Sequence, residues 1–98
     1  MEKIMHEYET VMVLSTKLGE EDLQGMVEKF KKLIADNGTL GEVEEWGKRR
    51  LAYEINDETE GYYTLINFTS DSQFPQELNR IYSITDGVLR YLVVRKDA

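Results

Sequence analysis

Apolar and polar positions change period along the first half of the chain, and the changes mark two elements. Residues 8–14 (YETVMVL) alternate and are rich in β-forming side chains, which predicts a strand. Apolar residues then recur at helical spacing, at Leu23, Met26, Val27, Phe30, Leu33 and Ile34. A helix is therefore expected to begin near Glu20 and to close at Asn37 and Gly38, with the glycine in the left-handed cap conformation.

The second half of the chain predicts two more strands, a shorter helix and a final strand. The strands are expected at residues 39–55, 62–68 and 88–95. Gly41 and Gly47 interrupt the first of these and indicate bulges, and a polar turn at 56–61 joins the first to the second. The N-cap formers at 69–72 precede the shorter helix, whose apolar face includes Leu78, Ile81 and Tyr82 and whose start carries Pro75.

The order strand, helix, strand, strand, helix, strand is the βαββαβ order of the ferredoxin-like arrangement. Right-handed crossovers would place two helices on one face of a four-stranded antiparallel sheet. The expected fold class is therefore α+β, in a single domain over residues 1–98, of which about 8–96 are structured.

The other face of this sheet would be left uncovered. Strand alternation predicts that it carries Val11, Val13, Tyr63, Leu65, Leu92 and Val94. An exposed apolar patch on a small domain usually marks a partner site, and the alternative is cover by a chain end or by a second copy.

Composition narrows the class of protein. The chain of 98 residues is 41% hydrophobic and has no Cys, which indicates a globular domain without disulfides or thiolate metal sites and fits a reducing compartment. An apolar run of signal-peptide or membrane-span length is not seen, so a cytoplasmic protein without membrane contact is expected. The glycines and acids match neither a phosphate-binding nor a calcium-binding loop, and no cofactor is expected.

Candidate catalytic residues are scattered, and the chain is not expected to be an enzyme. The single histidine, His6, is predicted to lie in a solvated tail, without a partner to orient it as a base. Residues 15–19 (STKLG) lack the glycine-rich loop with Arg that an acylphosphatase on this fold would need.

The net charge of −7 argues against a protein that binds nucleic acid alone. Residues 1–47 hold five Lys/Arg and eleven Asp/Glu, a net of −6, whereas residues 48–98 hold seven and eight, a net of −1. Guanidinium groups grip phosphate and nearby aromatic rings can stack on unpaired bases, so the clustered cations of the second half are candidates for binding. The predicted RNA- or partner-binding residues are Lys48, Arg49, Arg50, Arg90, Arg95, Tyr63 and Leu92. Trp46, Tyr53 and Tyr62 are expected to pack.

Four motifs together resemble one family. They are YETVMVL near the start, WGKRRLAYEI in the middle, GYY at the third strand and VLRYLVVR at the end. Their order and spacing are similar to those of bacterial ribosomal protein number six of the small subunit, from about Tyr8 to Lys96, and the block WGKRRLAY is the most specific piece. By position, Arg49 and Arg50 match the basic pair of the family and Arg90 matches the Arg of its last strand.

This resemblance implies a ferredoxin-like fold and a structural, non-enzymatic role. Family members bind the central domain of small-subunit ribosomal RNA as a heterodimer with ribosomal protein number eighteen, which is small and basic. A basic partner would explain how an acidic chain joins an RNA assembly, because the partner supplies much of the phosphate neutralisation. The alternative is a ferredoxin-like regulatory or small-ligand-binding domain that homodimerises.

Overall fold

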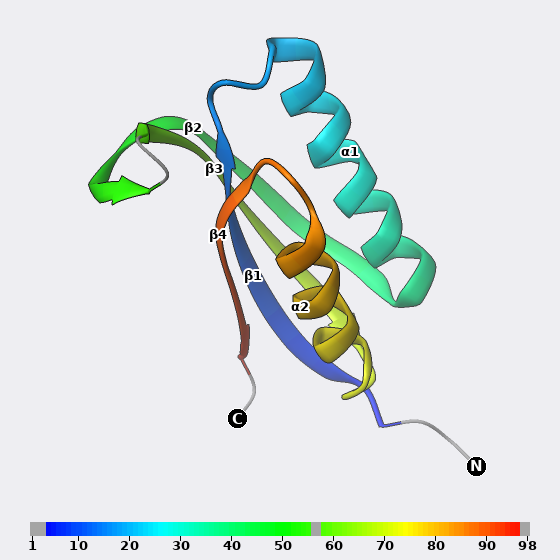
Figure 1. The fold of residues 1–98 in the computed structure, drawn as a ribbon. Helices are drawn as coiled ribbons and strands as arrows, with labels where there is room; N and C mark the ends of the chain where they lie inside the picture. The colour runs from blue at the N-terminus through cyan, green and yellow to red at the C-terminus, as the bar shows by residue number, and fades with distance from the viewer. Residues whose placement is uncertain (1–3, 56–57, 97–98) are drawn as a thin grey trace.

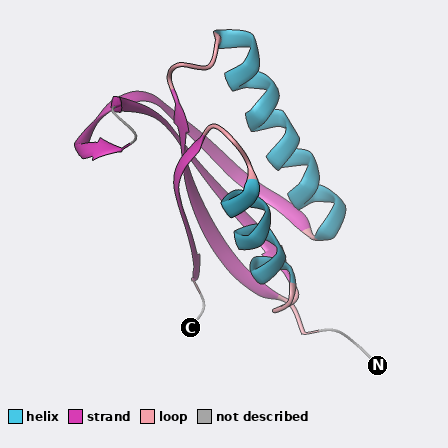
Figure 2. Ribbon diagram, viewed as in Figure 1, coloured by secondary structure: helices cyan, strands magenta, loops and turns pink. Residues whose placement is uncertain are grey.

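The computed structural model describes residues 4–55 and 58–96 and has the predicted order of elements (Figure 1). The elements are β1 (His6–Ser15), α1 (Glu20–Asn37), β2 (Thr39–Ile55), β3 (Glu58–Ser70), α2 (Phe74–Ile84) and β4 (Val88–Arg95). The strands form one four-stranded sheet in the order β2-β3-β1-β4, with every neighbouring pair antiparallel. Both helices cover the same face of the sheet (Figure 2), which confirms the ferredoxin-like α+β fold. Neither described helix combines the length and apolar character needed to span a bilayer.

The core lies between the helices and one face of the sheet. Its strand residues alternate as the sequence predicts, with Thr10, Met12 and Leu14 of β1 fully or almost fully buried. The helix residues that complete it are Leu23, Val27, Phe30 and Ile34 of α1 and Phe74, Leu78 and Tyr82 of α2. Apolar area removed from water at these positions is the main force that holds the helices to the sheet.

Two strands are longer than predicted. β1 begins at His6, which pairs with Ser70, so the prediction that His6 lies in a tail is wrong. β3 begins at Glu58, so residues 58–61 are strand and not turn, whereas residues 56–57 of the predicted turn lie outside the described residues. The polar residues of this segment indicated a turn. They are compatible with a strand because Thr59 and Glu60 are exposed, so β3 needs no apolar side chain at these positions.

Gly38 ends α1 for a different reason from the one expected. Its backbone is extended, with φ −172° and ψ −151°, so the predicted left-handed cap is wrong. A Cβ at this position would lie 2.2 Å from the carbonyl oxygen of Thr69 on β3. Glycine is needed because the backbone of β3 passes too close for any side chain.

The predicted bulges in β2 are present. The pairing of β2 with β3 shifts between Leu40 and Val43, around Gly41, and again between Glu45 and Gly47. Gly47 has φ 78°, a conformation that glycine adopts without steric cost. Trp46 is the extra residue at this second bulge, because it stands between the paired residues Glu45 and Gly47.

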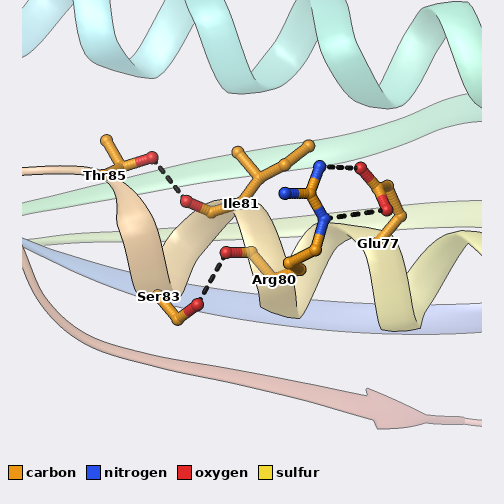
Figure 3. Close-up of polar contacts among 5 residues, drawn as sticks. All are labelled: Glu77, Arg80, Ile81, Ser83 and Thr85. Atoms are coloured by element: carbon orange, nitrogen blue, oxygen red, sulfur yellow. Dashed lines mark hydrogen bonds and ion pairs between the residues drawn. The ribbon is translucent and has the colours of Figure 1, made fainter.

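The start of α2 is fixed by one of the N-cap formers. The carboxylate oxygen Oδ1 of Asp71 accepts hydrogen bonds from the backbone N–H groups of Gln73 and Phe74, each at 3.0 Å. The exposed side of α2 carries an ion pair between Arg80 and Glu77, and its end is closed by hydroxyl-to-carbonyl bonds from Ser83 to Arg80 and from Thr85 to Ile81 (Figure 3). The hydrogen bond from Arg80 lowers the pKa of the Glu77 carboxyl.

Candidate partner and nucleic-acid interface

The sheet face away from the helices is the candidate interface, and we call it the open face. Its residues on β1, β3 and β4 are Glu9, Val11, Val13, Tyr63, Leu65, Asn67, Arg90, Leu92 and Val94. Strand pairing sets Tyr63, Val13 and Arg90 in one row across the sheet and Leu65, Val11 and Leu92 in the next. A hollow between these rows is lined by Val11, Val13, Tyr63, Arg90, Tyr91 and Leu92.

The apolar part of the open face is smaller than the sequence predicts. Leu92 and Val94 are 55% and 42% exposed, as expected for an uncovered face. Val13 and Leu65, in contrast, are only 3% and 7% exposed, so the predicted patch loses two of its six members. A Cβ on Gly61 would lie 2.3 Å from Cγ1 of Val13 and 3.2 Å from Cδ2 of Leu51, which shows that Leu51 packs onto this part of the sheet.

The hairpin of β2 and β3 bends over the open face, away from both helices (Figure 1). Nη1 of Arg90 on β4 donates a hydrogen bond to the hydroxyl oxygen of Tyr53 on β2 at 3.2 Å, and the guanidinium lies 6.0 Å from the centre of the same ring. In the order β2-β3-β1-β4, β1 lies between the hairpin and β4, so this contact requires the end of the hairpin to pass over β1. The bend brings a residue of the central motif to the last strand.

Trp46 also lies on the side of the open face. Its ring stacks on that of Tyr63, with centroids 6.3 Å apart and planes at 16°. Trp46 and Tyr53 are 42% and 60% exposed, so neither is a core residue, although each packs against another strand as expected, Trp46 on Tyr63 and Tyr53 on Arg90. The sequence contained one indication that Trp46 lies on the open face, namely Gly47, which indicates a bulge. A bulge changes the face to which the side chain of its extra residue points, and Trp46 is that residue.

The basic triplet is divided between the two sides of the hairpin. Arg49 pairs with Gly61, and a Cβ on Gly61 would point toward Val13 on the open face, so Arg49 lies on that face as well. Lys48 pairs with Tyr62 and Arg50 with Glu60, so strand alternation puts both on the other side. Lys48 there borders a hollow near the start of α1, together with Thr16, Leu18, Glu20, Leu23, Gln24 and Tyr62.

The two Arg residues of β4 are divided in the same way. Arg90 pairs with Val13 on the open face, whereas Arg95 pairs with Tyr8, whose side chain belongs to the helix-covered core. Of the seven predicted binding residues, the structure therefore brings together Arg49, Tyr63, Arg90 and Leu92 on the open face. Lys48, Arg50 and Arg95 lie on the opposite side.

Tyr62 is a packing residue, as expected. Its hydroxyl donates a hydrogen bond to Oε1 of Glu45 at 3.0 Å, and the side chain packs against the core. Burial, followed by the interaction with Glu45, raises the pKa of Tyr62. This pair holds the helix-facing side of β2 to β3 next to the bulge.

The open face has the chemistry of a binding surface. It combines exposed aliphatic side chains, a stacked aromatic pair and two guanidinium groups, which suit apolar contact, ring stacking and anion recognition. Within residues 4–55 and 58–96, no three His, Asp or Glu side chains converge as a metal site would require.

Comparisons with known proteins agree on one family. The family model described as "Ribosomal protein S6" matches residues 7–95. The small ribosomal subunit protein bS6 of Thermoanaerobacter pseudethanolicus is 56% identical over 96 residues, covering 95% of this chain and 99% of that protein. The protein of the same name from Caldanaerobacter subterraneus is 53% identical over 96 residues, with the same coverage. A crystal structure of 30S ribosomal protein S6 from Thermotoga maritima superposes with a TM-score of 0.90 at 34% identity, covering 96% of this chain and 90% of that one.

Proposed function

The chain belongs to the ribosomal protein S6 family, and we propose that it serves as a structural constituent of the small ribosomal subunit that binds the central domain of small-subunit ribosomal RNA together with ribosomal protein number eighteen. The role is structural and not enzymatic, as in the family. In this role the chain works on the ribosome, in the cytoplasm.

The observation that carries the proposal is the open face. A sheet with helices on one side only leaves Leu92 and Val94 exposed beside Arg90, and the bent hairpin adds Arg49 and Trp46 to the same side. Exposed apolar area next to guanidinium groups suits a surface that meets a protein and RNA in one assembly. A basic protein partner also offsets the net charge of −7, which would otherwise repel RNA.

The proposal is tested by measuring RNA binding with and without the basic partner. A fragment of the central domain of small-subunit ribosomal RNA is titrated with the chain alone, with ribosomal protein number eighteen alone, and with both, at two salt concentrations. We expect weak, salt-sensitive binding by the chain alone and much tighter binding with the partner, because the partner neutralises phosphates that an acidic chain cannot.

A pull-down from bacterial lysate in moderate salt provides the independent check. Recovery of ribosomal protein number eighteen and ribosomal RNA would support the proposal. A clean homodimer that recovers neither would contradict it and would favour the homodimerising regulatory domain instead.

A further inference from the structure

The distal part of the β2–β3 hairpin is held in its bend by three separate contacts. We call residues 51–55 and 58–60 the hairpin tip. Leu51 packs over Gly61 on the same side as Val13, and Tyr53 meets Arg90. The third contact is made by Glu58, a residue to which the proposed function gives no part.

Glu58 is a buried carboxylate. It is 7% exposed, and the hydroxyl of Ser15 donates a hydrogen bond to its Oε1 at 2.6 Å. Ser15 is 6% exposed and stands at the end of β1, 43 positions away in the sequence. Burying a carboxylate is costly unless hydrogen bonds replace its water, so this pair binds the tip to a defined place on the sheet.

Ser15 is itself fixed to the frame of the domain. Its hydroxyl oxygen accepts a hydrogen bond from the backbone N–H of Lys17 at 3.2 Å, and its own N–H donates to the carbonyl of Gly87 at 2.7 Å. The residue thereby joins β1, the loop before α1 and the turn before β4. A group bonded to Ser15 is held by the rigid part of the fold.

The tip needs such an anchor because its ladder is interrupted. The pairing of β2 with β3 shifts between Arg50 and Ile55, where regular strand hydrogen bonds would otherwise fix the direction of the hairpin. Glu58 pairs with Ile55 beyond this break, and its hydrogen bond with Ser15 joins that part of the hairpin directly to β1. The bond therefore bridges the interruption in the ladder.

We propose that Glu58 is a positioning residue for the open face, which acts through Ser15 to fix the bend of the hairpin tip. The bend sets Tyr53 against Arg90, so the guanidinium is already oriented when a partner arrives. Preorganised groups bind more tightly because less conformational entropy is lost on binding. The role of Glu58 in binding rests on the proposed function, whereas the anchor, which is the hydrogen bond between Ser15 and Glu58, does not.

The anchor is tested in the free chain by 15N relaxation of the backbone. Glu58→Ala and Ser15→Ala should lower the order parameters of residues 51–55 from about 0.85 to below about 0.6, while those of the core strands stay high. Glu58→Gln should keep most of the order, because its amide oxygen can still accept the bond from Ser15. Glu60→Ala is the matched control, since it removes an exposed acid from the same strand two positions away.

Two results would overturn the anchor: an ordered tip in both Glu58→Ala and Ser15→Ala, or equal loosening of the core and the tip. A Glu58→Gln tip as loose as that of Glu58→Ala would overturn its hydrogen-bond basis. If Glu58→Ala does not fold, the other two variants still test the anchor. Ser15→Ala removes the donor of the hydrogen bond and should loosen the tip, whereas Glu58→Gln keeps the acceptor and should not.

The binding arm separates this proposal from the proposed function. With ribosomal protein number eighteen present, Glu58→Ala should weaken RNA-fragment assembly by about three- to tenfold relative to Glu60→Ala, through lost preorganisation. Equal affinities of these two variants would overturn the positioning role. Failure of the wild-type chain to assemble would contradict the proposed function, and the relaxation result would then still decide the anchor.

Discussion

At the scale of single residues, two glycines stand in opposite surroundings. A Cβ on Gly25, in the middle of α1, would meet no atom within 4 Å. Gly25→Ala should therefore raise the free energy of unfolding by about 0.5–1 kcal/mol, because alanine loses less backbone entropy in a helix. Urea unfolding followed by circular dichroism measures the change. An unchanged or lower midpoint would mean that the helix depends on this glycine in a way that the open space around it does not explain.

Gly38 should respond in the opposite sense. Its Cβ would lie 2.2 Å from the backbone oxygen of Thr69, and a strand backbone cannot move aside as a side chain can. Gly38→Ala should lower the free energy of unfolding by about 1–3 kcal/mol, as in other overpacked sites. The same urea titration tests it, with Gly25→Ala as the matched control. A neutral Gly38→Ala would show that β3 and the end of α1 can separate without loss.

Thr64 holds a buried hydroxyl that the rest of the described structure leaves unsatisfied. The residue is fully buried, and its Oγ1 has no hydrogen-bond partner among the described residues. Thr64→Val keeps the shape and removes the unpaired group, so it should stabilise the fold by about 1 kcal/mol. Thr10→Val is the control, because the Thr10 hydroxyl is bonded to both Tyr82 and the carbonyl of Leu92 and its loss should destabilise. If both substitutions changed the free energy of unfolding equally, the Thr64 hydroxyl would not be unsatisfied as described.

At the scale of elements, α2 is tied to the sheet through one buried tyrosine. The ring of Tyr82 packs 4.6 Å from that of Phe30 of α1 and 5.2 Å from that of Tyr91 of β4, and its hydroxyl lies 3.0 Å from Oγ1 of Thr10. Thr10 can donate its proton to the carbonyl of Leu92, which leaves Tyr82 as the donor to Thr10. Tyr82 thus joins both helices to the two strands beneath them.

Burial raises the pKa of Tyr82 from 10.0 to about 12, although the hydrogen bond with Thr10 partly lowers it. The unfolded chain then loses this proton first, so the contribution to stability is complete below pH 10 and is lost as the pH rises towards about 12. The full loss amounts to roughly 2–3 kcal/mol. Phenylalanine has no proton to lose, so Tyr82→Phe lacks this pH dependence. Between about pH 10 and pH 12 the free energy of unfolding of the wild-type chain should therefore fall relative to that of Tyr82→Phe. Urea midpoints measured from about pH 9 to pH 11.5 check it; parallel curves would contradict it.

The elements were predictable from sequence, whereas the bend of the hairpin was not. Periodicity located both helices and all four strands because burial of one face repeats every 2 or 3.6 residues. The bend depends on Trp46 as an extra residue, on the space above Gly61 and on a carboxylate that looks like part of a polar turn. The bulge at Trp46 could be expected from Gly47, but the packing over Gly61 and the bond between Ser15 and Glu58 join residues far apart in sequence, and local pattern carries no record of them. For the same reason the sequence grouped Lys48, Arg49 and Arg50, although strand pairing separates them.

At the scale of the whole molecule, the charges differ between the two faces of the sheet as well as between the two halves of the sequence. Arg49 and Arg90 share the open face with exposed Leu92, while Arg50 lies on the other side of the hairpin. An assembly that uses the open face should therefore distinguish two neighbouring arginines of equal charge. This separates contact at a site from general attraction by the field of the molecule, which would treat both alike.

Arg49→Ala should weaken assembly with ribosomal RNA and the basic partner about tenfold, whereas Arg50→Ala should change it about two- to threefold, as a rim charge does. Both residues are exposed strand positions, so thermal unfolding should be nearly unchanged in each and serves as the control for folding. The salt dependence of binding adds a second measure, since loss of a phosphate contact reduces the slope of log K against log salt by about one. A reduced slope in Arg49→Ala would assign this arginine to RNA, and an unchanged slope with weaker assembly would assign it to the protein partner. Equal weakening by the two substitutions would contradict the open face as the interface and leave the hairpin as a whole to attract its partners by charge.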